Sequence, residues 1–336
     1  MADGSVLLIV YGAIGAALFF DFVNGFHDAA NSIATVVGTK VLRPLKAVAI
    51  AAAANFAGPF IFGTAVAATV GKGIIVPEFS TVEVILAGLI GAIVWDLITW
   101  WFGLPSSSSH ALIGGLVGSA LFVGGFEAIV FGGVERVLVF MVVSPSVGFA
   151  IAASFAVAIM FFLRKSVPGK VNKVFGRLQI ASSAFFSLTH GANDGQKTMG
   201  VITALLIAGG LLQSEDFIVP LWVIIGAAAA IALGTFFGGW RIVKTMAFRL
   251  TNLKPYQGFC AETGGGVILT TMAWMGIPVS TTHAISGAIM GVGATKRLSA
   301  VRWGLGKRIV YAWIITIPAS AGLAAASMWI IKALSG

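Results

Sequence analysis

Two short polar segments interrupt long apolar runs, and both carry residue types that bind ions. The first is Asn24-Gly-Phe-His-Asp-Ala-Ala-Asn-Ser32, and the second is Thr189-His-Gly-Ala-Asn-Asp-Gly-Gln-Lys-Thr-Met-Gly200. A charged side chain at mid-bilayer costs about 3 kcal/mol, so Asp28, Asp194 and Lys197 are expected to have a function. Carboxylate and amide oxygens are the ligands that small hard cations prefer. We therefore predict a coupling-ion site with oxygen ligands: Asn24, Asp28, Asn31, Asn193 and Asp194.

The alternative for each carboxylate is that it caps its own helix, which is common near a helix N-terminus. Capping alone does not require an Asp at matching positions in both halves of the chain. Sodium is the metal ion that this ligand set suggests, at Asp28, Asn31 and Asp194. All four histidines (His27, His110, His190 and His283) lie in the polar motifs, which favours a shared polar centre over four separate packing histidines.

Two runs of hydroxyl residues follow a proline and precede a histidine. They are Leu104-Pro-Ser-Ser-Ser-Ser-His110 and Ile277-Pro-Val-Ser-Thr-Thr-His283. Hydroxyls together with the free N–H groups of a helix start bind anions, whereas a simple N-cap explains only one hydroxyl in each run. We predict that the two runs hold a tetrahedral oxyanion from opposite sides. The predicted anion ligands are Ser106, Ser107, Ser108, Ser109, Ser280, Thr281 and Thr282, with Gln196 and Lys197.

Glu262 is a further candidate member of the coupling-ion site. It lies in an apolar run, where an unpaired carboxylate takes up a proton, so it is a candidate proton carrier. An ordinary interfacial carboxylate near Lys254 explains it equally well.

The elements that position these residues are predicted to be membrane helices. The chain is 58% hydrophobic and only 10% charged. Its apolar stretches reach the roughly 20 residues that a helix needs to cross a hydrocarbon core, and the short alternating segments of a transmembrane barrel are missing from the sequence. The single cysteine, Cys260, excludes an intrachain disulfide. We predict an all-α polytopic protein of the cytoplasmic (inner) membrane.

The net charge of +9 is distributed over alternate loops. Residues 39–46, 164–177, 241–254 and 296–308 hold 17 of the 21 Lys and Arg residues and no acidic residue. A surface that binds nucleic acid does not divide itself over alternate loops, so no nucleic-acid partner is expected. By the positive-inside rule, these four loops face the cytoplasm and both termini face outward.

The motifs occur twice in the same order with nearly the same spacing. Asp28 and Asp194 are 166 residues apart, and His110 and His283 are 173 apart. The charge pattern starts one half outside and the other inside, so we predict two inverted repeats, residues 1–163 and 178–336, joined by a cytoplasmic basic linker at 164–177. We expect each half to begin with a broken helix, at about 5–38 and 178–212, and to contain a re-entrant hairpin, with tips near Pro105 and Pro278.

These four motifs resemble those of the PiT family of inorganic phosphate transporters over nearly the whole chain. The resemblance implies secondary active phosphate uptake by symport with Na⁺ or H⁺, no other cofactor, and a homodimer with one pathway per subunit. It assigns cation and phosphate binding to Asp28, Asn31, Asn193, Asp194 and the two hydroxyl runs. Lys197 stands where sodium-coupled members have a second Asn, and Asn55 where animal members have Glu. Both features resemble bacterial members associated with proton coupling and metal-phosphate substrates.

Three alternatives remain at this point. A sulfate permease, or one for another tetrahedral oxyanion, would use the same fold. An intramembrane hydrolase could use Ser109 or Thr282 with a histidine, but adjacency in sequence does not place base and nucleophile in reach of one another. A channel makes little use of two closed hairpin tips. We therefore predict a transporter and not an enzyme.

Overall fold

The computed structural model describes residues 4–213 and 217–335, which are almost entirely helical. The first half contains α1 (Gly4–Gly38), α2 (Pro44–Phe62), α3 (Ala65–Lys72), α4 (Val82–Trp101), α5 (Ser108–Gly124) and α6 (Phe131–Phe162). The second contains α7 (Pro168–Ala208), α8 (Leu221–Phe237), α9 (Trp240–Lys244), α10 (Pro255–Trp274), α11 (Thr281–Ala294) and α12 (Trp303–Ser335). The described parts also contain three short 3-10 helices, η1 (Pro77–Phe79), η2 (Gly125–Ala128) and η4 (Leu298–Ala300), and one π-helix, η3 (Thr245–Leu250).

The helices have the length and composition of membrane spans. Within residues 4–213 and 217–335, six helices are long and apolar enough to cross a bilayer, and α8 followed by α9 and η3, bent by 56°, makes a seventh if it is counted as one span. Large apolar side chains on the outer surface are exposed, among them Leu8 at 75% and Phe162 at 78%. Exposed apolar area of this kind faces lipid rather than water. The predicted all-α polytopic membrane protein is confirmed.

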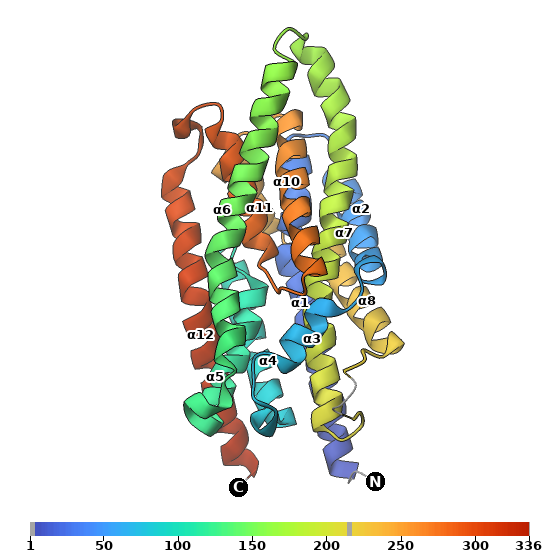
Figure 1. Cartoon of the computed structure of the whole chain (residues 1–336), viewed down its shortest axis with the longest axis vertical. Helices are drawn as coiled ribbons and strands as arrows, with labels where there is room; N and C mark the ends of the chain where they lie inside the picture. The colour runs from blue at the N-terminus through green and yellow to red at the C-terminus, as the bar shows by residue number, and fades with distance from the viewer. Residues whose placement is uncertain (1–3, 214–216, 336) are drawn as a thin grey trace.

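Two helical hairpins enter from opposite ends of the molecule. In Figure 1, α4 and α5 occupy the lower half, where both termini lie, and α10 and α11 occupy the upper half. The connection between α4 and α5 and the connection between α10 and α11 carry the two hydroxyl runs. Each run therefore lies at the tip of a hairpin, near the middle height of the bundle, as the sequence predicts.

The last long helix of each half packs against the hairpin of the other half. The α6 helix contacts α10 and α11, whereas α12 contacts α4 and α5. The first helices are exchanged in the same way, because α1 packs against α8 and α2 packs against α7. The two halves are thus intertwined. Whether they are inverted copies of one another stays a prediction.

The helix breaks expected in the polar motifs do not occur. Both α1, with 35 residues, and α7, with 41, are continuous through Asn24-Gly25 and through the second motif. The motif glycines permit close helix contact instead: a Cβ atom at Gly25 would lie 2.2 Å from the Ile231 carbonyl oxygen of α8. A Cβ atom at Gly191 would lie equally close to the Asn55 carbonyl oxygen of α2. At the second contact, the side chain of His190 is hydrogen-bonded to that of Asn55 on α2, while the helix backbone stays intact.

The actual breaks lie one helix later in each half. In the first half, α2 ends before Gly63, whose φ is +76°, and α3 follows. In the second half, α8 ends at Gly238, whose φ is +69°, and α9 follows. Glycine adopts this left-handed conformation without the steric penalty of a Cβ atom. Broken helices are therefore part of the fold, at positions that the motifs did not mark.

Candidate functional site

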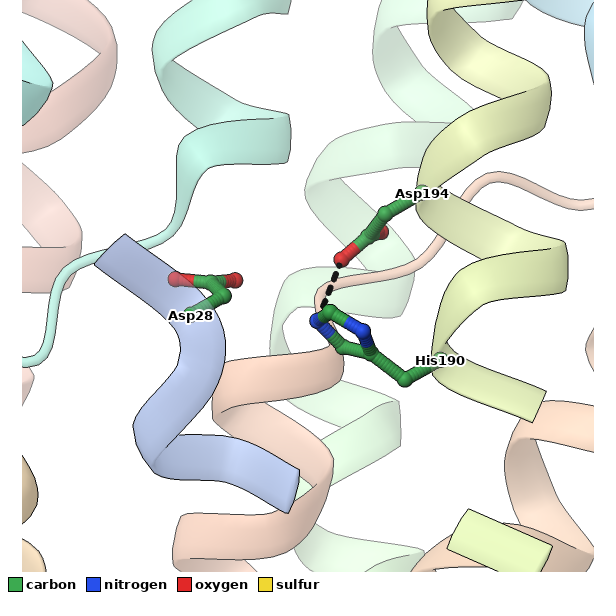
Figure 2. A group of neighbouring side chains, drawn as sticks. All are labelled: Asp28, His190 and Asp194. Carbon is green, nitrogen blue, oxygen red and sulfur yellow. Dashed lines mark ion pairs between the residues drawn. The ribbon is translucent and has the colours of Figure 1, made fainter. Parts of the chain in front are cut away.

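The two motif carboxylates meet between α1 and α7. Asp28, His190 and Asp194 are at most 2% exposed, and each offers a ligand atom within 4.8 Å of the others. Figure 2 shows Asp28 on α1 facing His190 and Asp194 on α7. His27 Nδ1 is 2.7 Å from Asp28 Oδ1, and His190 Nε2 is 3.1 Å from Asp194 Oδ2. The two carboxylates supply oxygen ligands of the kind that a small hard cation prefers, and the His190 nitrogen is a third ligand atom beside them.

Both hairpin tips place hydroxyl groups on these carboxylates. Thr281 Oγ1 lies 2.9 Å from Asp194 Oδ2 and 3.4 Å from Asp28 Oδ2. From the same tip, Thr282 Oγ1 donates to Asp28 Oδ2 over 3.1 Å and accepts from the Asn31 amide over 2.9 Å. The hydroxyl of Thr281 therefore contacts carboxylates from both halves of the chain.

The other tip completes this arrangement. Ser108 Oγ lies 3.4 Å from Asp28 Oδ1, and Ser109 Oγ lies 3.4 Å from Asp194 Oδ1. Ser108, Ser109, Thr281 and Thr282 are all at most 5% exposed. Their hydroxyls are donors, so an oxyanion that binds here would replace the carboxylates as the acceptor.

The remaining predicted hydroxyls have other partners. Ser107 Oγ accepts from the His110 N–H, and Ser280 Oγ accepts from the His283 N–H, each over 3.2 Å. These two residues are the N-caps of α5 and α11. Ser106 Oγ donates to Thr99 over 2.8 Å and lies 3.2 Å from His27 Nε2. It therefore supports the histidine that orients Asp28.

Lys197 joins α7 to both hairpin tips. Its ammonium group donates to Asp194 Oδ1, to Ser109 Oγ and, over 2.8 Å, to the Val279 carbonyl oxygen. An ammonium has three donors, and all three are used here. Lys197 is 2% exposed. It occupies a position where a positive charge is surrounded by oxygen atoms, as a bound cation would be.

The protonation of His190 is constrained by a chain of hydrogen bonds from α8. Thr235 donates to the Ile231 carbonyl oxygen, so it accepts from the Asn55 amide, which lies 2.7 Å away. This orientation turns Asn55 Oδ1 toward His190 Nδ1 at 3.1 Å, and that nitrogen must carry a hydrogen. The other ring nitrogen, Nε2, is then the one that faces Asp194, either as a donor or as a free ligand for a cation.

Three predicted residues have neighbours other than Asp28 and Asp194 in the structure. Gln196 Oε1 accepts from the Val66 N–H at the start of α3, over 2.9 Å. Asn193 donates to the Thr189 and Leu269 carbonyl oxygens. Asn24 lies beside Asp21, one helical turn before Asp28. Helix geometry explains why Gln196 does not contact Asp28 or Asp194. It follows Asp194 by two residues, which is about 200° around the helix axis, whereas Lys197 follows by three residues and lies on the same side as Asp194.

Glu262 lies in a separate buried cluster between α1, α7 and α10. Its carboxylate accepts from Thr35, Ser182 and Gln179, the last over 3.2 Å. It is fully buried, so it is not an exposed interfacial carboxylate.

The sequence interpretation missed several of these partners. Thr35 follows Asp28 by seven residues and so lies on the same side of α1, a spacing that could have indicated it. Thr99, Thr235, Gln179 and Ser182 carry no local signal of this kind.

The last two histidines lie away from the carboxylates but against each other. The rings of His110 and His283 have centroids 4.6 Å apart, and His283 also stacks on Trp313. Since one histidine comes from α5 and the other from α11, the contact joins the two hairpins. The four histidines thus divide into two that touch the carboxylates and two that join the tips.

Comparison with known proteins agrees with this geometry. Residues 24–324 match the phosphate transporter family. The chain is 55% identical to a probable low-affinity inorganic phosphate transporter of Rhizobium meliloti, over 94% of this chain and 95% of that protein. It is 43% identical to a protein of the same description from Bacillus subtilis, over 97% and 98%. Among solved structures, a sodium-dependent phosphate transporter matches with a TM-score of 0.88 at 26% identity, over 97% of this chain and 99% of that one.

Proposed function

The chain belongs to the phosphate transporter family, and we propose that it takes up inorganic phosphate across the cytoplasmic membrane by symport with Na⁺ or H⁺. The observation that carries the proposal is the position of Thr281, whose hydroxyl contacts Asp28 and Asp194 at once. Helix starts and hydroxyls that bind an anion thereby adjoin carboxylates that bind a cation, which is the arrangement that couples the two.

Phosphate binding would use the four hydroxyls of Ser108, Ser109, Thr281 and Thr282 as donors. In the structure these hydroxyls donate to Asp28 and Asp194, so an arriving anion must take over their hydrogen bonds. Neighbouring carboxylates would repel sulfate, which has no proton at pH 7. Monohydrogen and dihydrogen phosphate carry O–H groups that donate to a carboxylate. The geometry therefore favours phosphate over sulfate, which is the second candidate.

Cation coupling follows from the charges buried in the centre. Four buried aspartates lie in the described parts of the chain, each at most 2% exposed: Asp21, Asp28, Asp96 and Asp194. The ammonium group of Lys197 is buried as well. A multiply charged anion that joins four carboxylates and one ammonium requires further positive charge. Na⁺ at Asp28, Asn31 and Asp194, beside His190, or protons on the carboxylates, would supply it. A structural relative is described as sodium-dependent, which supports Na⁺ as one candidate.

Lys197 would reduce the number of free cations that a transport cycle needs. Its three acceptors come from α7 and from both hairpin tips, so its charge lies where a mobile cation would be held. We place it as a built-in positive charge beside the phosphate site. Glu262, held by three donors, is the candidate proton carrier away from the centre.

The orientation and assembly belong to the same proposal. Residues 1–163 and 178–336 would be inverted repeats around the 164–177 linker, with both termini outside and two copies forming a homodimer. The two hairpins, which enter from opposite ends, support this arrangement.

The test is uptake of radiolabelled phosphate into proteoliposomes under separately imposed sodium and proton gradients, with sulfate and arsenate as competitors. Asp194→Asn should abolish uptake while the protein stays folded, because the variant loses the charge that binds both Lys197 and His190. Glu135→Gln, which removes an exposed carboxylate, is the matched control and should transport normally. Normal uptake by Asp194→Asn, or inhibition by sulfate equal to that by unlabelled phosphate, would reject the proposed function.

A further inference from the structure

A second group of polar side chains lies between α1 and α7, outside the central carboxylates. Asp21, Asn24 and Thr198 are at most 2% exposed. Thr198 and Asn24 are the polar side chains beside the Asp21 carboxylate. Four of their oxygen atoms, Asp21 Oδ1 and Oδ2, Asn24 Oδ1 and Thr198 Oγ1, make no hydrogen bond in the described parts of the chain. Buried oxygens of this kind are strongly disfavoured unless something binds them.

The group lies on the side of the centre that faces the chain termini. Asp21 precedes Asp28 by seven residues, which is about 10 Å along α1, and Thr198 follows Asp194 by four residues, which is about 6 Å along α7. The two helices are antiparallel, and the N-terminal end of α1 and the C-terminal end of α7 lie at the same end of Figure 1. Asp21, Asn24, Asp28 and Asn31 thus form a row of oxygen side chains on one side of α1.

The unpaired atoms identify the chemistry of the missing partner. All four oxygens can accept hydrogen bonds or bind a cation, and residues before and after them in sequence, such as Phe20 and Val201, belong to a buried apolar cluster. A proton on Asp21 and the Thr198 hydroxyl would together supply two donors, whereas a cation that takes several oxygen ligands can bind all four oxygens at once. One carboxylate with neutral oxygens matches a monovalent charge.

We propose that Asp21, Asn24 and Thr198 form an outer binding site for a sodium-sized monovalent cation, distinct from the site proposed above at Asp28, Asn31 and Asp194. The nearest charges on the neighbouring face of α7 are Asp194, which attracts a second cation, and Lys197, which opposes it. The outer site would hold a cation next to the row of oxygens that continues to the centre. This role in transport rests on the proposed function, but binding itself can be measured without phosphate.

The experiment is equilibrium binding of ²²Na⁺ to the purified full-length protein without phosphate, with choline keeping the ionic strength constant. Asp21→Asn should lower the number of bound sodium ions by one per chain, and Thr198→Val should raise the half-saturating Na⁺ concentration of that site about tenfold. Thr203→Val is the matched control, because Thr203 is equally buried on α7 but its hydroxyl donates to the Met199 carbonyl oxygen of its own helix. Its sodium binding should equal that of the wild type.

Each outcome separates this inference from the proposed function. An unchanged sodium stoichiometry in Asp21→Asn, or wild-type binding that responds to pH but not to Na⁺, overturns the outer site while leaving phosphate uptake in place. If the wild type transports no phosphate but Asp21→Asn binds one sodium ion fewer than the wild type, the outer site is supported and the proposed function is rejected. If Asp21→Asn does not fold, Thr198→Val against Thr203→Val decides the question, since equal half-saturation in these two variants also overturns the outer site.

Discussion

Replacing Lys197 by Asn should make phosphate uptake more dependent on sodium. The substitution removes the ammonium group that bonds to Asp194, Ser109 and Val279, and it leaves a buried carboxylate with one charged partner fewer. Breaking a buried ion pair in this way costs about 3 to 5 kcal/mol. Asp194 keeps His190 and Thr281 as partners, so we expect the lower end of that range. This corresponds to about a hundredfold lower population of the hydrogen-bonded site described above.

Sodium should reverse most of this loss. A cation at a hundred times its dissociation constant stabilises the form that binds it by about 2.7 kcal/mol. In proteoliposomes with a fixed proton gradient, exchanging external choline for sodium should therefore raise uptake by Lys197→Asn by up to about a hundredfold, and clearly more than uptake by the wild type.

Two comparisons distinguish this explanation from simple damage. Lys173→Asn removes a positive charge from the basic linker and should leave the sodium dependence unchanged. The double variant Asp194→Asn with Lys197→Asn removes both charges, so its loss of thermal stability should be smaller than the sum of the two single losses. If Lys197→Asn has the same ratio of uptake in sodium and choline as the wild type, the ammonium does not replace a cation and the reasoning is wrong.

Three further predictions concern the residues around the carboxylates. Thr281→Val should reduce phosphate uptake at least tenfold, because it removes the hydroxyl shared by Asp28 and Asp194. Ser280→Ala should mainly lower the free energy of unfolding, by about 1 kcal/mol, because it removes an N-cap. Equal effects of the two variants on the Michaelis constant for phosphate would contradict these separate roles. Asn55→Leu should weaken cation binding about tenfold or more by releasing the ring of His190, as loss of an outer partner of a metal ligand does, and a cation titration that matches the wild type would show that Asn55 does not orient it. Gly191→Val should prevent the close packing of α7 on α2 and lower the yield of folded protein in detergent. Gly169→Val, at a position with open space around it, is the control. Equal yields of the two variants would show that α7 and α2 do not pack closely at Gly191.

The sequence was sufficient to predict which motifs come together. Polar residues are costly in lipid, so the four motifs had to find partners, and the partners available to them were one another. This argument predicts that the two hydroxyl runs lie in one chamber with Asp28 and Asp194. It also predicts hairpin tips at the hydroxyl runs, since the proline in each run ends a helix.

The sequence was not sufficient to decide what the motif glycines do. Gly25 is compatible both with a helix break and with a close helix contact, and only the position of Ile231 on α8 distinguishes them. The partner of each hydroxyl is undetermined for the same reason, because Ser107 and Ser108 are adjacent yet one caps α5 and the other contacts Asp28. Gln196 is different, since the angle of 100° per residue already turns it away from Asp194.

The exchange of α6 and α12 between the halves has a mechanical consequence. Each hairpin is braced by a helix whose chain continues into the opposite half, so a tip cannot be withdrawn without pulling on the other side of the protein. We therefore expect opening toward one face of the membrane and closure toward the other to be coupled through α6 and α12.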